Sequence, residues 1–451
     1  MSEQLQNAHL ADLHTLAAEL GVERFRMLPR EELAAAILER DPDATAPERE
    51  PAPEPDDQPE KAERSERSEP RGGGRSRGGR GGRGGRGRGN GGGRRREQDD
   101  ARDDQDDQAE DDPGEPISGI LDITPRGHGF IRLSGLGSDA DDVYVSPSQI
   151  RRCEMQRGDE VAGPARKPRR GERYPALIHV DTINGAEPGA EASRLADSTP
   201  VHPSRRIPLA PAEGADEGEA ALVRSFDLLN PLARGQRVLV EAAPGSGRTT
   251  LMRGLASSLS AVEDLEVVVL LIDERPEEVA EWTERVGEEA LAVATAEMRS
   301  GEQLRLVELA FGRASRQAER GADVVLLVDS LSRIAVAADD PDRVKPIFGA
   351  GRETEEEGVG SLTVIATVLT DDDDEGGVLK ALDTTESSRI ALDRDLAAAG
   401  TFPALDPSAS RVAGEEHFLD EGEHSKLREL RAELAGLSPA DAVAKLRDRL
   451  S

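Results

Sequence analysis

The chain has 451 residues, a formal net charge of −32 and only 2% aromatic residues. This length is enough for two or three domains, whose cores must be built mainly from aliphatic side chains. The single cysteine, Cys153, excludes an intramolecular disulfide framework and suits a reducing compartment. No stretch has the pattern of a signal peptide, and no apolar run is long enough to span a membrane. The sequence therefore predicts a cytoplasmic protein with no membrane partner.

Residues 1–40 are predicted to form a small helical module. Apolar residues recur at helical spacing in LADLHTLAAELGV, and PREELAAAILER begins with a proline and acidic residues, as helix starts do. Residues 41–115 are rich in Pro, Glu, Gly, Arg and Asp and contain almost no large apolar residue. Such a segment cannot build a core, so we expect a disordered linker.

The linker carries two blocks of opposite charge. Residues 71–96 read RGGGRSRGGRGGRGGRGRGNGGGRRR, and the acidic stretch EQDDARDDQDDQAEDDPGE follows. Local charge governs binding more than the net charge does. The first block is typical of an RGG arm that contacts RNA phosphates and stacks guanidinium groups on bases, but a flexible linker has the same composition. The acidic block either competes for the arm or only keeps the linker in solution.

Residues 116–186 consist of short alternating runs separated by glycine, proline and aspartate, a pattern that predicts a small antiparallel β-barrel. Phe130 and Arg132 lie two residues apart in GHGFIRL and therefore share one face of a strand. Tyr144 and Tyr174, the only tyrosines, fall in the same segment. Exposed rings on such a barrel stack single-stranded bases, whereas rings inside it only fill the core. The pattern leaves both interpretations open.

Residues 200–451 are predicted to form an α/β domain with a helical C-terminal tail. The apolar runs RVLVEA, EVVVLLID, DVVLLVD, SLTVIATVL and RIALD alternate with helical patterns, as in a domain built around a parallel sheet. The tail contains two further helical patterns, SKLRELRAELAGL and PADAVAKLRDRL.

The stretch VLVEAAPGSGRTTLM has the strand, glycine turn and helix of a phosphate-binding loop. Gly245 and Gly247 would let backbone N–H groups approach the phosphates, and Thr249 would ligate Mg²⁺. Arg248 stands where the loop's lysine is expected, and its guanidinium keeps the charge but is larger and planar. A glycine-rich turn without any ligand would give the same pattern.

Two other apolar strands of this domain end in carboxylates. VVLLVDS ends in Asp329, where an acid that binds Mg²⁺ would lie, and LLIDERPEE ends in Asp273, Glu274 and Arg275. The carboxyl edge of a parallel sheet is where nucleotide sites form. These acids favour a nucleoside triphosphate site over a plain turn.

Longer motifs run in order along the chain. The barrel contains GILDITPRGHGFIR, DDVYVSPSQIRR, GDEVAG and GERYPALIHVDTING, and the α/β domain contains FDLLNPLARGQRVLVEAAPGSGRTT, LLIDERPEEVAEW, VVLLVDSLSR, FGAGRETEEEGVGSLTVIATVL and LDRDLAAAGTFPALDPSASR. They resemble the family of the bacterial transcription termination factor Rho, and residues 1–40 resemble its small N-terminal domain. The resemblance implies a multidomain fold with a helical module, an OB or cold-shock-type barrel and a RecA-like P-loop ATPase domain.

The resemblance implies individual roles in ATP hydrolysis with Mg²⁺. Glu274 would polarise the attacking water, Arg275 and Arg333 would position nucleotide and couple subunits, and Arg411 and Arg394 would be arginines donated at a subunit interface. The implied nucleotide-binding set is Gly235, Gln236, Arg237, Gly245, Ser246, Gly247, Arg248, Thr249, Thr250, Arg275 and Phe402, of which Phe402 would stack on adenine. Thr249 and Asp329 would hold Mg²⁺ through the nucleotide.

The resemblance also implies partners. Single-stranded, pyrimidine-rich RNA with a preference for cytosine would lie on His128, Phe130, Arg132, Tyr144, Glu172 and Tyr174. The family implies a homo-hexamer that acts on the RNA polymerase elongation complex.

The sequence departs from the family at several positions. His128 replaces an aromatic ring, and Gly245 and Gly400 replace a lysine and an arginine of the ATPase site. The segment IAVAADDPDRV is shorter than the pore loop expected there. The second pore segment, TDDDDEGGVLKALDTTESS, carries four consecutive aspartates and only Lys380 as a cation. These acids either repel RNA at the pore or lie on an outer turn.

Two functions follow from these observations. The first is an RNA-dependent ATPase and helicase that binds nascent RNA, translocates along it and terminates transcription. The alternative is a Rho-like RNA-binding ring with weak or lost ATPase activity that acts as a regulator or scaffold. Arg248, Gly245, Gly400 and the altered pore segments favour the alternative. The retained Thr249, Glu274, Asp329 and Arg411 favour the enzyme, as does a chain that has only six lysines among 58 basic residues.

Overall fold

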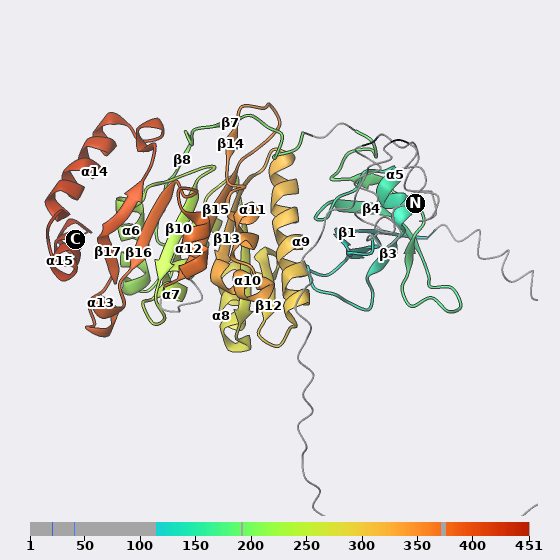
Figure 1. The fold of residues 1–451 in the computed structure, drawn as a ribbon, viewed down its shortest axis with the longest axis horizontal. Helices are drawn as coiled ribbons and strands as arrows, with labels where there is room; N and C mark the ends of the chain where they lie inside the picture. The colour runs from blue at the N-terminus through green and yellow to red at the C-terminus, as the bar shows by residue number, and fades with distance from the viewer. Residues whose placement is uncertain (1–19, 21–39, 41–113, 191–192, 371–375, 451) are drawn as a thin grey trace, which may run out of the picture. The chain divides into compact units, whose positions relative to one another are not determined.

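A computed structural model describes residues 20, 40, 114–190, 193–370 and 376–450. The chain divides into two units, 1–91 and 92–451. The predicted helical module, the RGG arm, the acidic residues 97–113 and the four aspartates at 371–374 lie outside the described residues, apart from positions 20 and 40. The second unit contains a β-barrel followed by an α/β domain (Figure 1).

The barrel closes through five of its six strands. Their order is β1-β2-β3-β5-β4, and β4 pairs back to β1. Because a closed ring of five strands cannot alternate in direction throughout, one pair must be parallel. That pair is β3 and β5, and the other pairs are antiparallel, as predicted. The elements are β1 (Glu115–Ile123), β2 (Gly129–Arg132), β3 (Val143–Val145), α5 (Pro147–Arg152), β4 (Glu160–Arg166), β5 (Ala176–Leu177) and β6 (Thr182–Ile183).

Aliphatic side chains fill the barrel. Its buried cluster is formed by Leu121, Ile131, Val143, Val145, Ile150, Met155, Val161, Ala165 and Leu177. No ring of Phe130, Tyr144 or Tyr174 belongs to this cluster. The aromatic residues therefore lie outside the core, which removes the interpretation in which they fill the interior.

The α/β domain is built on a seven-stranded sheet with the order β12-β11-β13-β15-β10-β16-β17. All neighbours are parallel except β16 and β17. β10 comes first along the chain and lies between β15 and β16. Because β10, β13 and β11 run in the same direction, their carboxyl ends lie at one edge of the sheet. The strands are β10 (Arg237–Ala242), β11 (Leu265–Glu274), β12 (Leu291–Thr295), β13 (Asp323–Asp329), β15 (Leu362–Leu369), β16 (Ser388–Leu392) and β17 (Leu405–Val412).

The central strands β10, β11, β13 and β15 bury side chains on both faces of the sheet. In β13, Val324, Leu326 and Val328 pack into one core, whereas Val325 and Leu327 pack into the other. This explains why the sequence shows continuous apolar runs rather than alternation. The first core is covered by α9 (Ser300–Glu319) and α10 (Leu331–Ala338), and the second by α6 (Glu217–Leu229), α7 (Arg248–Ser260), α8 (Pro276–Val286), α14 (Glu421–Leu434) and α15 (Pro439–Leu450).

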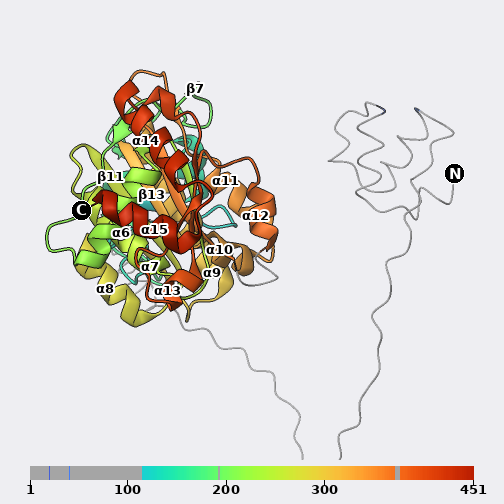
Figure 2. The same ribbon diagram turned by 90° about the vertical axis from the view of Figure 1, so that its left-hand side faces the viewer.

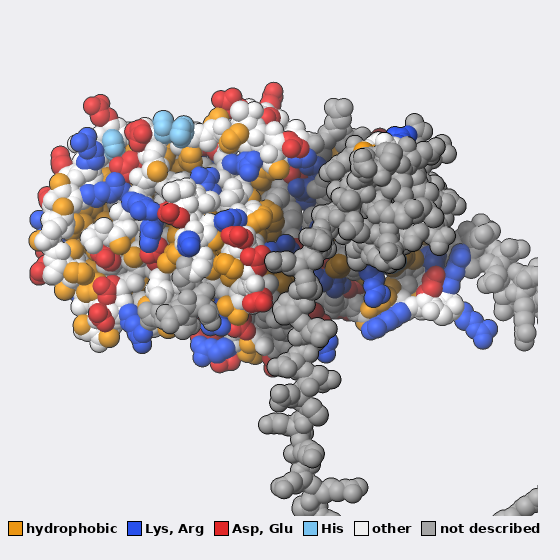
Figure 3. Space-filling view, in the orientation of Figure 1, with side chains coloured by type: hydrophobic (Ala, Val, Ile, Leu, Met, Phe, Trp, Pro, Cys, Tyr) orange, Lys and Arg blue, Asp and Glu red, His pale blue; other side chains and the backbone are white. Residues whose placement is uncertain are grey.

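Shorter elements complete the domain. Figure 2 shows α14 and α15 close to α6, and Figure 3 shows acidic and basic side chains interspersed over the face of the α/β domain that it presents. In the described part of the chain, no helix is both long and apolar enough to cross a membrane. The remaining elements are β7 (Pro200–Val201), β8 (Arg206–Ile207), β9 (Leu232–Ala233), η3 (Glu288–Ala290), η4 (Pro341–Val344), α11 (Lys345–Phe348), β14 (Glu353–Thr354), α12 (Gly376–Leu382), α13 (Arg394–Ala398) and η5 (Glu415–His417).

Candidate functional site

The predicted phosphate loop joins β10 to α7. Gly247 precedes α7 with φ of 94°, a left-handed conformation that L side chains rarely adopt, and its neighbour Ser246 donates to the carbonyl of Ala243 at 2.7 Å. No side chain caps the start of α7, so its first N–H groups face the loop. Thr249 and Thr250 follow within the first turn of this helix. The loop has the geometry that an anion at a helix N-terminus requires.

Arg248 reaches across the sheet edge to Asp329. Its Nε lies 3.1 Å from Oδ1 of Asp329, and the hydroxyl of Thr367 donates to the same oxygen at 2.9 Å. Asp329 is 2% exposed, and its Oδ2 has no hydrogen-bond partner. The arginine that replaces the expected lysine therefore pairs with the acid that was predicted to serve Mg²⁺.

Glu274 lies at the end of β11 beside this pair. A bulge shifts the register of β11 between Ile272 and Glu274, and Asp273 at the bulge has φ of 57°. Burial raises the pKa of Glu274, and the nearby Asp329 carboxylate raises it further, while the Arg275 N–H and Arg248 oppose the shift. A carboxylate whose pKa is raised is a stronger base than an ordinary glutamate, which suits it to accept a proton from water.

The two arginines predicted to position nucleotide behave differently. Arg333 of α10 donates through Nη1 to Asp273 at 2.7 Å, which brings it to the same edge as Glu274. Arg275 is 65% exposed, and its Nη2 donates to Glu278 within α8 at 2.6 Å. Arg333 thus joins the acidic edge, whereas Arg275 turns toward its own helix.

Phe402 lines a surface pocket between α6 and the C-terminal helix α15. The pocket also contains Gly218, Gly400, Arg224 and Arg447. The ring edge of Phe402 lies 3.2 Å from the position that a Cβ of Gly218 would take. A flat heterocycle that stacks on Phe402 would therefore meet little side-chain bulk on α6.

Gly235, Gln236 and Arg237 lie at the start of β10, whereas the phosphate loop follows its end. Gln236 is fully buried and accepts from the N–H of Ala233 at 3.0 Å. Arg237 donates to the carbonyls of Thr385 at 2.6 Å and Gly351 at 2.7 Å. Contacts within the protein hold these three residues, so they have a structural role away from the phosphate loop.

Arg394 and Arg411 lie at opposite ends of the strands beside β10, because Arg394 follows the carboxyl end of β16, which pairs with the end of β10, whereas Arg411 lies near its start. Arg411 of β17 lies opposite Arg389 of β16, which pairs in turn with Leu239 near the start of β10. Its Nη2 pairs with Glu386. Arg394 is the first residue of α13. The structure therefore does not bring Arg411 to the phosphate loop of its own chain.

The predicted RNA-binding rings gather on one face of the barrel. The ring of Phe130 makes edge contacts with Tyr144 and Tyr174, with centroids 5.9 Å and 5.2 Å apart. His128 joins them, because its Nδ1 lies 2.9 Å from the hydroxyl of Tyr144. All four side chains are half-buried. They form a continuous aromatic surface of the kind on which bases stack.

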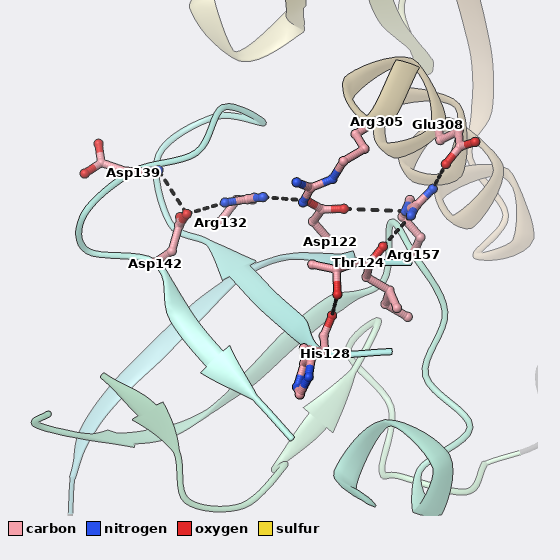
Figure 4. Close-up of polar contacts among 10 residues, drawn as sticks. Asp122, Thr124, His128, Arg132, Asp139, Asp142, Arg157, Arg305 and Glu308 are labelled. Atoms are coloured by element: carbon pink, nitrogen blue, oxygen red, sulfur yellow. Dashed lines mark hydrogen bonds and ion pairs between the residues drawn. The ribbon is translucent and has the colours of Figure 1, made fainter. Parts of the chain in front are cut away.

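Arg132 lies on the same face, and two buried carboxylates of the barrel bind its guanidinium. Its guanidinium carbon lies 5.8 Å from the centre of the Phe130 ring, which confirms that the two side chains share a side of β2. Arg132 is 5% exposed and pairs with Asp122 and Asp142 (Figure 4). Its charge is therefore balanced within the barrel until another acceptor competes for it.

Glu172 lies at the rim of the aromatic face. It accepts from Arg166 at 2.6 Å and 2.8 Å, and these hydrogen bonds, helped by the N–H of Arg169, lower the pKa of Glu172 to about 2. A surface pocket is lined by Tyr144, Glu172 and Tyr174 together with Arg152, Arg166 and Arg173. This pocket combines stacking surfaces with cations that suit a polyanion.

Comparisons with known proteins agree with both halves of this arrangement. The RNA-binding domain of the Rho termination factor matches residues 117–189, and the nucleotide-binding domain of the ATP synthase alpha/beta family matches residues 223–340. Transcription termination factor Rho of Haemophilus influenzae is 36% identical over 363 residues, which cover 75% of this chain and 85% of that protein. The chain belongs to the Rho family of transcription termination factors.

Other Rho proteins give the same result. That of Rhodopirellula baltica is 36% identical over 359 residues, covering 74% of this chain and 68% of the relative. That of Salmonella typhimurium is 34% identical over 364 residues, covering 75% and 86%. Among solved structures, a type III secretion system ATPase of pathogenic bacteria is 22% identical with a TM-score of 0.44, over 60% of this chain and 76% of that one.

This Rho-family chain also uses residues that sequence reasoning missed. Asp142 pairs with Arg132, and the period-2 alternation of β3 could have revealed it, since it lies two residues before Tyr144. Arg166 fixes Glu172. Thr367 fixes Asp329, and nothing distinguishes this threonine within the apolar run of β15.

The residues present fit a Mg²⁺ ion that arrives with a nucleotide. The free Oδ2 of Asp329 is a buried carboxylate oxygen of the type that Mg²⁺ prefers, and Thr249 lies in the first turn of α7. Among the described residues, no group of three or more His, Cys, Asp and Glu side chains could hold a metal ion by itself. Phosphate oxygens would therefore have to complete the coordination.

Proposed function

We propose that this Rho-family chain is an RNA-dependent ATPase that binds nascent single-stranded RNA, translocates along it and releases transcripts from RNA polymerase. One observation carries the proposal: an aromatic, cation-rimmed barrel face and a phosphate loop with Glu274 and Asp329 beside it occur in one chain. The match to a Rho RNA-binding domain and to a nucleotide-binding domain supports the pairing of these two activities.

The phosphate loop and its neighbours bind the nucleotide in this proposal. Backbone N–H groups at the start of α7 hold the phosphates, and Ser246 keeps the loop closed through its bond to Ala243. Arg248 moves from Asp329 to the β- and γ-phosphates, where its planar group binds two oxygens at once. Phe402 stacks on adenine. Mg²⁺, held by Asp329 and Thr249, would neutralise charge on the phosphates.

Glu274 acts on the attacking water, and Arg333 positions Glu274. The carboxylate of Glu274 orients a water for in-line attack and accepts its proton, and its raised pKa makes it a stronger base than an ordinary glutamate. Arg333 holds Asp273 at 2.7 Å and thereby keeps the bulge that aims Glu274 at the sheet edge. The products are ADP, inorganic phosphate and the proton carried by Glu274.

A hexameric ring completes each site in the proposal. Arg411 lies away from the phosphate loop of its own chain, which is compatible with a role at the site of a neighbouring subunit. An arginine donated in this way neutralises charge in the transition state and is worth roughly 10³–10⁵ in rate in related enzymes. Mixing Glu274→Gln and Arg411→Ala subunits tests this arrangement: hydrolysis that returns in mixtures of two inactive variants supports sites shared between subunits. No recovery would contradict them.

The RNA in the proposal is single-stranded, pyrimidine-rich and preferably cytosine-rich. Stacking on the rings of Phe130, Tyr144 and Tyr174 holds bases without requiring a duplex, and Arg132 and Glu172 supply polar contacts to base edges. The chain would meet its RNA and RNA polymerase in the cytoplasm.

One observation favours the alternative function, a Rho-like RNA-binding ring without ATP turnover. The guanidinium of Arg248 pairs with Asp329, and an arginine that stays there would block the Mg²⁺-binding acid. Transcript release separates the two functions. Purified full-length chain should release RNA from stalled RNA polymerase elongation complexes with ATP and not with a non-hydrolysable analogue. Equal release with both, or none with either, would contradict the enzymatic proposal.

A further inference from the structure

The carboxylate of Asp122 joins the barrel to helix α9. The Asp122 side chain is 3% exposed, and its Oδ2 accepts from Arg132 of β2 and from Arg305 of α9, whose Nη2 lies 2.5 Å away (Figure 4). Arg157, in the turn before β4, has its Nε 3.5 Å from Oδ1. One buried carboxylate therefore holds a guanidinium of the proposed RNA face and a guanidinium of the α/β domain.

The ion pairs continue along α9. Arg157 also pairs with Glu308 of α9, and Glu308 pairs with Arg343 of η4. η4 lies beside α12, since Pro341 is 3.4 Å from the position that a Cβ of Gly377 would take. Both segments belong to the parts of the chain that were predicted to flank the pore. A continuous series of ion pairs thus runs from the RNA face to η4.

These pairs share too few carboxylates. Four guanidinium groups compete for three carboxylates in the cluster, whose members are Arg132, Arg157, Arg305, Arg343, Asp122, Asp142 and Glu308. Most of these groups are buried or half-buried, so their interactions are weakly screened. When one guanidinium binds an acceptor outside the cluster, the carboxylate that it leaves can pair more strongly with the remaining guanidinium groups.

The backbones of the turn at Gly158 and of α9 are in close contact. Gly158 adopts φ of 88°, and a Cβ there would lie 2.2 Å from the carbonyl carbon of Gly312 in α9. Conversely, a Cβ on Gly312 would lie 2.6 Å from the carbonyl oxygen of Arg157. The turn that carries Arg157 therefore packs backbone against backbone on α9, and a shift of one is passed to the other.

We propose that Asp122 is a positioning residue that couples RNA binding at Arg132 to α9 and, through Glu308, to η4. An RNA oxygen that binds Arg132 replaces Asp122 as its partner, and the Asp122 carboxylate then serves Arg305 and Arg157 alone. The contact between barrel and α9 tightens when RNA is bound. The inference rests on the proposed function, because it assumes that Arg132 contacts RNA.

The direction of the effect follows from competition for Asp122. If Arg305 is removed, Oδ2 of Asp122 accepts only from Arg132, and RNA has to break a stronger pair. Arg305→Gln should therefore weaken RNA binding although Arg305 itself touches no RNA. Coupling free energies between sites typically correspond to changes of about 5-fold or more, and we expect about a fivefold rise in Kd.

A double-mutant cycle tests the coupling in the full-length chain. Binding of fluorescein-labelled oligocytidine is measured for the unmutated chain, Arg305→Gln, Arg132→Gln and the double variant. Arg305→Gln should raise Kd about fivefold when Arg132 is present and leave it unchanged in the Arg132→Gln background. Arg305→Lys, which keeps a charge near Asp122, should restore most of the affinity.

Arg320→Gln is the matched control. Arg320 directly follows α9, and its Nη1 pairs with Glu160 of β4 at 2.8 Å. Glu160 is not one of the carboxylates that pair with Arg132. Its substitution should change oligocytidine affinity less than twofold in either background. Equal effects of Arg305→Gln with and without Arg132, or equal effects of the Arg305 and Arg320 variants, would overturn the inference.

Thermal unfolding and the affinity of the unmutated chain distinguish a failure of this inference from a failure of the proposed RNA binding. Thermal unfolding checks that both α9 variants fold, and if Arg305→Gln does not, the cycle is run with Arg305→Lys, for which the smaller shift must still vanish in the Arg132→Gln background. If the unmutated chain binds no oligocytidine, the proposed function fails and the inference falls with it. If the chain binds oligocytidine and the cycle is additive, only the inference fails.

Discussion

The Nε of Arg248 lies 3.1 Å from Oδ1 of Asp329, so the cation of the phosphate loop pairs with the acid that is expected to serve Mg²⁺. The other oxygen of Asp329 has no hydrogen-bond partner. In our proposal, ATP with Mg²⁺ exchanges this ion pair for two new ones: Arg248 binds phosphate, and Asp329 turns to the metal.

Replacing Arg248 tests whether its charge serves the phosphates. Arg248→Ala should lower kcat/KM for ATP by about 10²–10³, the usual cost of removing a group that stabilises transition-state charge. Arg248→Lys should retain activity, because lysine supplies the same charge as a compact group. Steady-state kinetics with saturating RNA measure both. Full activity in the alanine variant would show that Arg248 has no catalytic part.

Replacing Glu274 separates hydrolysis from binding. Glu274→Gln should lower kcat by about 10²–10⁴, because the amide cannot accept a proton from water. Binding of a fluorescent ATP analogue and of oligocytidine should remain within twofold of the unmutated chain. Glu277→Gln, an exposed neighbour on α8, is the control and should hydrolyse normally. Unchanged turnover in Glu274→Gln would remove this residue from the mechanism.

The pH dependence of turnover should report the same carboxyl group. Burial raises the pKa of Glu274, so the carboxylate is lost at a higher pH than for an ordinary glutamate. As pH falls through this raised pKa, Glu274 becomes protonated and kcat should fall with it. A pH profile of kcat at saturating ATP and RNA measures the acid limb. A limb centred at or below the ordinary glutamate pKa would contradict the assignment.

Removing one ring tests the RNA face. Phe130→Ala should weaken oligocytidine binding by about 1–3 kcal/mol, which is roughly 5- to 150-fold in Kd. Phe130→Tyr keeps a stacking surface and should bind almost as well. Leu133→Ala removes an apolar side chain that is 38% exposed just after the same strand, and it should have no effect. Equal losses in the Phe130 and Leu133 variants would mean that stacking is not the source of affinity.

Much of the fold could be predicted because buried parallel strands leave a strong signal. The run RVLVEA coincides with β10, and DVVLLVD coincides with β13, since both strands bury two faces and read as continuous apolar residues. β17 was missed: its sequence LDPSASRV is poor in β-formers, and as an edge strand it depends on β16 alone. β12 was missed because LAVAT is short and rich in alanine.

The site could be predicted one residue at a time but not as an arrangement. Motifs pointed to Arg248 and Asp329 separately, yet their ion pair depends on β15 standing between β10 and β13. The sequence showed that Phe130 and Arg132 share a face. It gave no sign that Asp122 holds Arg132 from behind, because that contact needs the pairing of β1 with β2 and the approach of α9.

The most direct test of the account is ATP hydrolysis by the purified full-length chain with Mg²⁺, measured with and without poly(C) RNA. We expect turnover that rises severalfold with poly(C). This result would mean that Arg248 leaves Asp329 and binds the phosphates in place of the missing lysine. RNA binding without any turnover would contradict it. That result would leave a Rho-family ring whose barrel binds RNA and whose phosphate loop is closed by its own arginine.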